Sequence, residues 1–194
     1  MTKLLILDMD GTIRVNGGAD LDNLELTSGF INSPKDQKLI PSAIAAIKEF
    51  KSKGFTIIGA SNQGGVAAGK KSLEDCYLEQ GYTLKLLNEE EADIDRIYFC
   101  PDYEGAKIHE VYGFVDDRFG DFDFCYYEVD NSTADKYRGL YRKPNAGMLN
   151  YAIDLWNPTG IIFVGDRDSD EQAAKAANVQ FIHAHEWCSS YWIA

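Results

Sequence analysis

The chain has 194 residues, of which 45% are hydrophobic and 26% are charged, a composition typical of a folded globular protein and unlike that of a disordered one. This length allows one sizeable core with a small lid, and it is short for two full domains. With 31 acidic and 19 basic side chains the formal net charge is −12, which disfavours non-specific binding to nucleic acids or anionic membranes.

Short apolar runs that alternate with helical segments predict an α/β fold with a mostly parallel sheet. Helix ends are indicated by Pro41 at a first helical position and by Gly54 at a helix end. Apolar residues on one face indicate two further helices, at 148–156 and 173–177. The predicted strands are residues 4–7, 55–60, 94–100, 161–164 and 179–182. We expect a single domain over residues 1–194.

Two segments do not follow this repeat. Residues 14–40 are rich in Gly, Asn and Asp and predict a flap, with room for a short hairpin. Residues 103–141 form a long insertion in which alternating apolar and polar residues at 122–126 predict one strand. Because the insertion is rich in aromatic residues and leads directly to Lys143, we expect an acidic lid over the carboxyl ends of the strands.

The N-terminal apolar run and the cysteines bear on the cellular compartment. Residues 4–7 are apolar, but Asp8 and Asp10 interrupt them too early for a secretory signal peptide. No segment approaches the roughly 20 apolar residues of a membrane-spanning helix. We therefore expect a cytoplasmic protein with reduced cysteines. The cysteines are widely spaced and include no C-x-x-C pair: Cys76, Cys100, Cys125 and Cys188.

Two predicted strands are followed by carboxylates, at the strand end where ligands bind in open parallel sheets. Asp8 and Asp10 follow the first strand, and Asp166, Asp168 and Asp170 follow the fourth. Close carboxylates repel each other unless a cation lies between them, and hard oxygen ligands suit Mg²⁺. Simpler roles stay open, because Asp-Gly is a common turn pair and some of the later acids can cap a helix.

Two other segments carry groups that can bind an anion. Ser61 and Asn62, with Gln63 and two glycines, follow the second strand, where hydroxyl, amide and backbone donors can cradle an anion. Arg142 and Lys143 precede a proline at a predicted helix start, which also suits an anion site. Each segment alone also fits a simple turn or a solvated surface pair.

Taken together and in this order, the four segments resemble the four motifs of the haloacid dehalogenase (HAD) superfamily of phosphatases. The resemblance spans residues 4–183 and implies a Rossmann-like three-layer α/β/α fold. Segments 61–65 and 142–148 are similar to the members with little or no cap domain, which include histidinol-phosphate and heptose bisphosphate phosphatases and the 3′-phosphatase domain of polynucleotide kinase. The matching positions are residues 8–12 (Asp-x-Asp-Gly-Thr), Ser61, Lys143, and Gly165-Asp166 with Asp170.

The resemblance implies a Mg²⁺-dependent phosphomonoesterase that forms an aspartyl-phosphate intermediate. It implies that Asp8 is the nucleophile and that Asp10 is the general acid and base. The implied ligands of the phosphate or substrate are Ser61, Asn62, Arg142 and Lys143. The implied Mg²⁺ ligands are Asp8, the Asp10 carbonyl and Asp166, with Asp170 in support.

Three functions compete. A small phosphorylated metabolite, of the sugar or histidinol phosphate type, is favoured as substrate because residues 66–143 carry more acidic than basic side chains. A polynucleotide 3′-phosphatase stays open through the similarity at 140–144, although a nucleic-acid groove needs a track of cations. A binding module without turnover is disfavoured, because no acid of the motifs is missing.

The sugar and histidinol members of the superfamily usually carry a zinc loop with paired Cys and His ligands. Here the corresponding region offers only Cys100, His109 and Cys125, whereas a structural zinc site needs about four nitrogen or sulfur ligands. We therefore expect no zinc, and we expect the insertion at 103–141 to take the place of the zinc loop.

Overall fold

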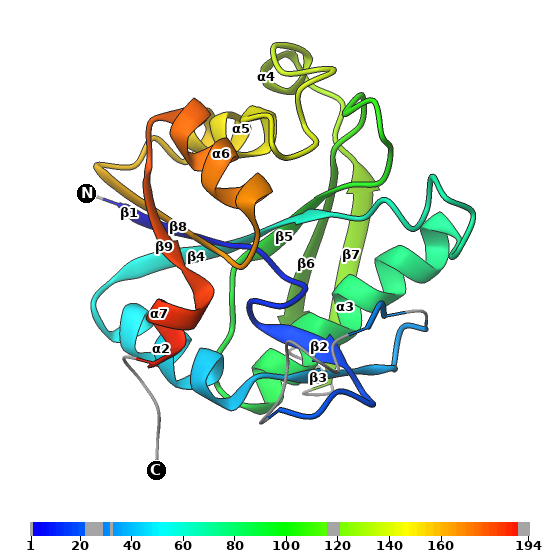
Figure 1. Cartoon of the computed structure of the whole chain (residues 1–194), viewed down its shortest axis with the longest axis vertical. Helices are drawn as coiled ribbons and strands as arrows, with labels where there is room; N and C mark the ends of the chain where they lie inside the picture. Colours follow the sequence, from blue (N-terminus) through cyan, green and yellow to red (C-terminus); the bar gives the residue numbers. More distant parts are fainter. Residues whose placement is uncertain (1, 22–28, 32, 116–120, 190–194) are drawn as a thin grey trace.

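A seven-stranded sheet runs through the computed structural model, which describes residues 2–21, 29–31, 33–115 and 121–189 (Figure 1). The strand order is β7-β6-β5-β4-β1-β8-β9. Its parallel part confirms the five strands that the apolar runs predicted, with β1 at the centre between β4 and β8. These strands are β1 (Lys3–Leu7), β4 (Phe55–Asn62), β5 (Arg96–Cys100), β8 (Gly160–Gly165) and β9 (Gln180–His183).

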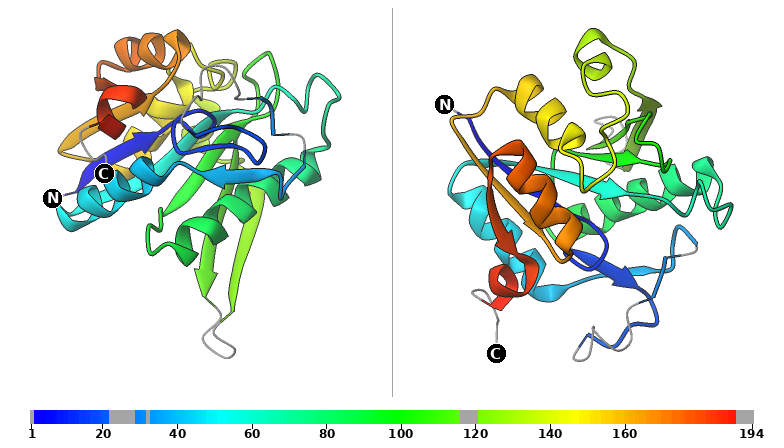
Figure 2. Two further views of the ribbon diagram at one scale, coloured as in Figure 1. Left: turned by 60° about the horizontal axis from the view of Figure 1, so that its bottom comes forward. Right: turned by 45° about the horizontal axis from the view of Figure 1, so that its top comes forward.

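Helices cover both faces of the sheet, which confirms the three-layer α/β/α prediction (Figure 2). Alternate residues of β1 face opposite layers: Leu5 and Leu7 join one apolar cluster, and Leu4 and Ile6 join the other. The first cluster lies under α2 (Pro41–Ser52), α3 (Leu73–Glu89) and α7 (Ala184–Ser189), and the second under α4 (Ser132–Asp135), α5 (Gly147–Trp156) and α6 (Asp168–Ala177).

Helix α3 was not among the predicted helices. Its start is well defined, because Ser72 and Asp75 form a capping box in which each side chain accepts a hydrogen bond from the other residue's backbone N–H. The buried side of the helix, however, includes Glu79, Gln80 and Thr83. Polar residues on the buried side blur the apolar periodicity by which an amphipathic helix is found in a sequence.

The insertion at 103–141 extends the sheet, and the prediction of a lid over the carboxyl ends is wrong for its two strands. These strands, β6 (His109–Val115) and β7 (Phe122–Glu128), are antiparallel to their neighbours. His109 pairs with Phe99 and Val111 pairs with Ile97, so β6 runs from the carboxyl end of β5 towards its amino end. Val111 of β6 is buried in the first apolar cluster, and Phe122 and Phe124 of β7 pack against that cluster, which removes apolar surface from water.

The predicted flap contains a short hairpin, for which its sequence left room. Strands β2 (Arg14–Asn16) and β3 (Gln37–Leu39) pair in antiparallel fashion. Residues 22–28 and 32 of this segment lie outside the described part of the chain. Among the helices described, none has the length and apolar character needed to cross a bilayer.

Candidate active site

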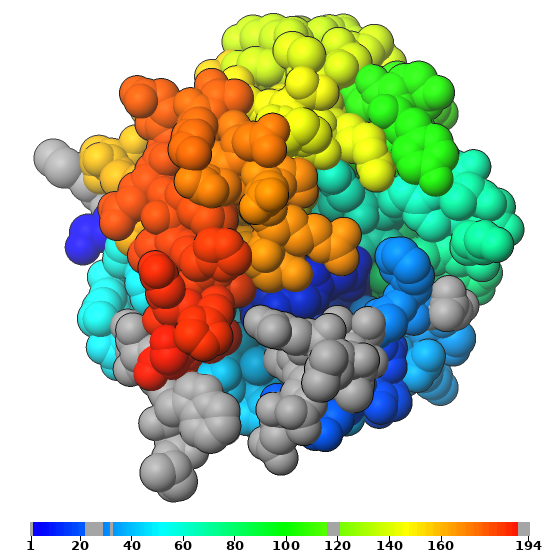
Figure 3. Space-filling model, in the orientation of Figure 1, coloured from blue at the N-terminus to red at the C-terminus, as the bar shows by residue number. Residues whose placement is uncertain are grey.

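The carboxyl ends of β1, β4 and β8 meet at one edge of the sheet, because these strands are parallel. Leu7 at the end of β1 pairs with Gly59 of β4 and Val164 of β8, which brings the segments after the three strands together. A cavity of about 910 Å³ opens there. In Figure 3 the dark blue N-terminal segment lies between the orange atoms of α6 and the blue atoms of the flap. All predicted site residues line the cavity: Asp8, Asp10, Ser61, Asn62, Arg142, Lys143, Asp166 and Asp170.

Lys143 is buried between two of the predicted carboxylates. Its Nζ atom lies 2.5 Å from Asp8 Oδ1 and 2.7 Å from Asp170 Oδ1, and it donates a hydrogen bond to the Ala60 carbonyl at 2.8 Å. Burial works against the charged amine, but the two carboxylates outweigh burial and raise the pKa of Lys143. A charged amine at the end of β1 suits an anionic ligand.

Asn62 holds the backbone of Lys143. Its Nδ2 donates to the Lys143 carbonyl at 2.8 Å, and its Oδ1 accepts from the Lys143 N–H at 3.0 Å. Both polar side-chain atoms of Asn62 are therefore engaged in positioning the lysine segment, whereas its place after the second strand predicted a contact with substrate. Ser61 is buried, and its hydroxyl accepts a hydrogen bond from Gln63 Nε2 at 2.9 Å.

Three carboxylates lie close enough together to bind a metal ion. One oxygen each of Asp8, Asp166 and Asp170 lies within 4.8 Å of the other two. Burial raises the pKa of Asp8 to about 7, and burial also raises the pKa of Asp166. Asp166 Oδ1 is buried and has no hydrogen-bond partner among the described residues. Both oxygens of Asp170 are engaged, Oδ1 with Lys143 and Oδ2 with the backbone N–H of Arg167, whereas Asp8 Oδ2 accepts only a long hydrogen bond of 3.5 Å from Thr12. The arrangement therefore fits a divalent cation held by Asp8 and Asp166.

Asp10 is held at both oxygens. Its Oδ1 lies 2.8 Å from Arg14 Nε, and its Oδ2 accepts a hydrogen bond from Gln63 Nε2 at 2.7 Å. Burial favours the neutral acid, but the Arg14 guanidinium outweighs burial and lowers the pKa of Asp10. The Asp10 side chain is still 34% exposed and faces the cavity, so it is accessible to a ligand.

Arg14 and Lys71 also line the cavity, although the sequence motifs did not predict them as site residues. Arg14 lay within the predicted flap, and its spacing of four residues from Asp10 was the one local signal of their ion pair. Lys71 belongs to no motif. Both residues pair with Glu79. Glu79 follows Arg14 by 65 positions, and no local sequence pattern reveals a contact between residues so far apart in the chain.

Arg142 and Tyr103 lie on the wall of the cavity. The guanidinium carbon of Arg142 lies 5.0 Å from the centroid of the Tyr103 ring. The residues considered for zinc have separate surroundings: Cys100 donates to the Asp102 carbonyl, the His109 ring hydrogen bonds to a tyrosine hydroxyl, and Cys125 is exposed on β7.

Comparisons with known proteins agree with this geometry. A family model described as HAD-hydrolase-like matches residues 140–184. The D-glycero-beta-D-manno-heptose-1,7-bisphosphate 7-phosphatase of Haemophilus influenzae is 30% identical over 183 residues, which cover 93% of this chain and 79% of that protein. The protein of the same description from Escherichia coli K12 is 30% identical over 179 residues, 90% of this chain and 74% of that protein.

A solved structure shares the fold. The D,D-heptose 1.7-bisphosphate phosphatase of B. bronchiseptica, complexed with magnesium and phosphate, has a TM-score of 0.61 and 22% identity. The match covers 100% of this chain and 89% of that one.

The parallel sheet, with acidic pairs and a buried lysine at its carboxyl edge, defines an α/β phosphatase. The relatives make the family definite: this chain belongs to the haloacid dehalogenase superfamily, and it is a phosphoric monoester hydrolase similar to the heptose bisphosphate phosphatases.

Proposed function

We propose that this protein is a Mg²⁺-dependent phosphatase that releases phosphate from a sugar phosphate through an aspartyl-phosphate on Asp8. The observation that carries the proposal is the position of Asp8, which lies at the end of the central strand with Lys143 Nζ 2.5 Å from one oxygen. The amine attracts the phosphate anion to the carboxylate that attacks it.

The chemistry proceeds in two displacements on phosphorus. An oxygen of the ionised Asp8 carboxylate forms a bond to phosphorus, and the bond from phosphorus to the ester oxygen breaks. Asp10 gives its proton to the leaving alkoxide and then takes a proton from the water that hydrolyses the aspartyl-phosphate. Lys143 and the Ser61 hydroxyl bind phosphoryl oxygens in both displacements.

Asp10 must hold a proton when the ester bond breaks. In the free enzyme Arg14 favours its ionised form. A phosphate dianion that enters the cavity raises the proton affinity of a carboxylate nearby, so substrate binding itself promotes protonation of Asp10.

Asp8, Asp166 and the carbonyl of Asp10 would hold Mg²⁺. When bound, the ion offsets the negative charge of the phosphate and of the carboxylates. The residues fit this role because Asp166 keeps a buried oxygen without a hydrogen-bond partner among the described residues.

The substrate class follows from the relatives and the cavity. The curated relatives are named for a phosphorylated heptose. The cavity of about 910 Å³ accommodates a sugar phosphate. Its wall includes the cationic side chains of Lys70, Arg142 and Arg167 and the ring of Tyr103.

A screen of phosphate release tests this substrate class. Its members are sugar mono- and bisphosphates, histidinol phosphate, nucleotides and a 3′-phosphorylated oligonucleotide. We expect the highest kcat/KM for a sugar phosphate. A preference for the oligonucleotide would establish the polynucleotide 3′-phosphatase instead.

Two interventions test the mechanism. Asp8→Asn preserves shape but removes the nucleophile, so we expect no phosphate release above background while the circular dichroism spectrum is unchanged. EDTA should stop the wild-type reaction, Mg²⁺ should restore it, and Ca²⁺ should not, because Ca²⁺ prefers longer bonds and more ligands. Turnover by the Asp8→Asn protein, or full activity without metal, would refute the mechanism.

A further inference from the structure

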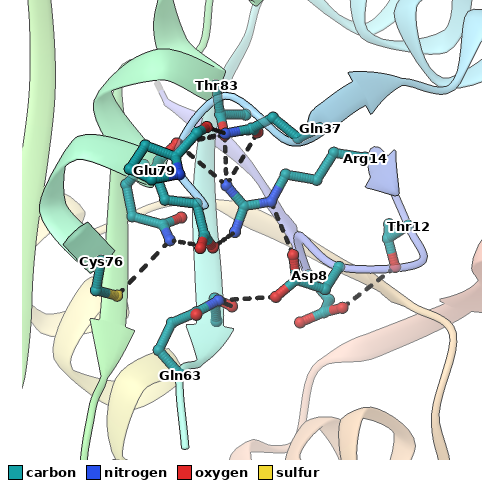
Figure 4. Close-up of polar contacts among 12 residues, drawn as sticks. Asp8, Thr12, Arg14, Gln37, Gln63, Cys76, Glu79 and Thr83 are labelled. Carbon is teal, nitrogen blue, oxygen red and sulfur yellow. Dashed lines mark hydrogen bonds and ion pairs between the residues drawn. The ribbon is translucent and has the colours of Figure 1, made fainter. Parts of the chain in front are cut away.

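Five side chains close a ring of polar contacts that begins and ends at Asp10. Asp10 Oδ2 accepts from Gln63 Nε2 at 2.7 Å, and Gln63 Oε1 accepts from Lys71 Nζ at 2.9 Å. Lys71 Nζ lies 2.5 Å from Glu79 Oε2, and Glu79 Oε1 lies 2.8 Å from Arg14 Nη2. Arg14 Nε returns to Asp10 Oδ1 at 2.8 Å. We call these residues the Asp10 ring; Figure 4 shows its contacts around Arg14 and Glu79.

Burial within the ring is unequal. The side chains of Arg14, Glu79 and Lys71 are 0%, 1% and 9% exposed, whereas that of Asp10 is 34% exposed. The ring holds two cations and two carboxylates, so its charge is balanced. Buried ion pairs contribute little net stability compared with apolar residues of the same volume. Core stability alone therefore does not account for the ring. Its most exposed member is Asp10, which lines the cavity.

Glu79 connects the two groups that hold Asp10. One of its oxygens pairs with Arg14, which contacts Asp10 directly, and the other pairs with Lys71, which holds Gln63. Arg14 is held further by α3, because its Nη1 donates to the Thr83 hydroxyl and to the Glu79 carbonyl. Glu79 is not among the described residues that line the cavity, so its influence on a ligand there passes through Arg14 and Lys71.

We propose that Glu79 is a positioning residue that, through Arg14 on one side and Lys71 and Gln63 on the other, sets the orientation of the Asp10 carboxyl group for proton transfer to the leaving group. This inference rests on the proposed function. A carboxylate offers about four lone-pair sites. Arg14 and Gln63 occupy one on each oxygen, which fixes the plane of the group and leaves the other sites for a proton.

The test compares two esters that differ in their need for a proton. An alkoxide leaves only when protonated, whereas p-nitrophenolate is a stable anion and leaves without a proton. The ratio kcat/KM reports the steps up to the first committed one, here the release of the leaving group, and is independent of the later hydrolysis. The two substrates are the best alkyl phosphate from the screen and p-nitrophenyl phosphate, measured with the full chain in Mg²⁺.

We expect Glu79→Gln to lower kcat/KM for the alkyl phosphate by about 10-fold to 100-fold, since a misplaced catalytic group costs up to about 100-fold. For p-nitrophenyl phosphate the decrease should stay below about 3-fold, because proton donation does not limit that reaction. Glu89→Gln is the matched control. Glu89 lies on the same helix and forms an exposed ion pair with Lys85, so this substitution should leave kcat/KM unchanged for both esters.

Different outcomes separate this inference from the proposed function. Asp10→Asn is the reference and should show the same selective loss more strongly. An equal loss on both esters in Glu79→Gln, beside a selective loss in Asp10→Asn, would overturn the inference alone. If Asp10→Asn itself affected both esters equally, the acid role of Asp10 would be wrong, and the inference would fall with it.

A second variant covers the case in which Glu79→Gln does not fold. Glu79→Gln combined with Lys71→Met removes one anion and one cation, so the buried charge stays balanced. We expect this double variant to show the same selective loss on the alkyl phosphate. Equal kcat/KM losses on the two esters in the double variant would overturn the inference.

Discussion

Gly11 allows the loop after β1 to approach Asp166. Its φ of +89° lies in the left-handed region, and a Cβ atom at this position would lie 2.3 Å from Asp166 Oδ2. Glycine is therefore required here for two reasons, the backbone conformation and the space taken by a proposed metal ligand. Gly54, with φ of +77°, meets only the first of these conditions, because no heavy atom lies within 4 Å of its Cβ position.

These two glycines make a matched pair. Gly11→Ala and Gly54→Ala each place a non-glycine residue in a left-handed conformation, which costs about 1–2 kcal/mol. Gly11→Ala also displaces the Asp166 carboxylate, so we expect kcat to fall by about 100-fold and the Mg²⁺ requirement to rise. Gly54→Ala should leave kcat unchanged. Steady-state kinetics over a Mg²⁺ titration measure both effects, and equal kcat values in the two variants would contradict the prediction.

At the scale of elements, α3 connects the site to the edge of the sheet. The helix supplies Glu79 to the Asp10 ring and packs against β6 and β7 on another side. Gly81 lies inside the helix where the ring of Phe124, on β7, comes close: a Cβ at Gly81 would lie 2.4 Å from a ring carbon. The close approach of Phe124 thus explains why glycine, a poor helix former, occupies this position inside the helix.

Gly81→Ala should destabilise the protein. In an exposed helix interior this change stabilises by up to about 1 kcal/mol, but here it forces the Phe124 ring away and should cost about 1–3 kcal/mol. Chemical denaturation measures the free energy of unfolding. In a Phe124→Ala background the same change should become stabilising, because the obstructing ring is absent. Destabilisation of equal size in both backgrounds would exclude the contact with the Phe124 side chain as the cause.

In the folded molecule, three acidic side chains gather at the carboxyl edge of the sheet, where a bound cation would relieve their mutual repulsion. Asp8, Asp166 and Asp170 converge on one point, with Lys143 as the cation between two of them. In a chain of net charge −12, repulsion within this cluster opposes folding, and a bound divalent ion would remove the opposition.

Mg²⁺ should therefore raise the melting temperature, independently of any turnover. An ion at 100 times its Kd stabilises the folded state by about 2.7 kcal/mol. Because burial raises the pKa of Asp8 to about 7, protons compete with the metal below that pH, and the shift in Tm should be larger at pH 8 than at pH 6. Calorimetry in EDTA and in Mg²⁺ at both pH values measures this difference in Tm. Asp166→Asn is the control and should abolish the shift; a shift that persists in this variant would place the ion elsewhere.

The parallel sheet and the acidic residues at its carboxyl edge are predictable from the sequence alone. Continuous apolar runs such as 4–7 are dictated by burial on both faces, so the strands are visible locally. The acids follow those runs directly, and parallel strands bring their carboxyl ends together, so Asp8 and Asp166 were predictable as neighbours before any coordinates.

The side chains that surround these acids and the position of the insertion depend on tertiary packing. The apolar alternation at 122–126 indicates a strand but not its partner. The partner is β6 at the sheet edge, where Phe122 and Phe124 pack against the first apolar cluster. The contact of Arg14 with Glu79 joins positions 65 apart. A charged residue looks the same in a sequence whether solvated or paired, and only packing that removes water makes a buried partner necessary.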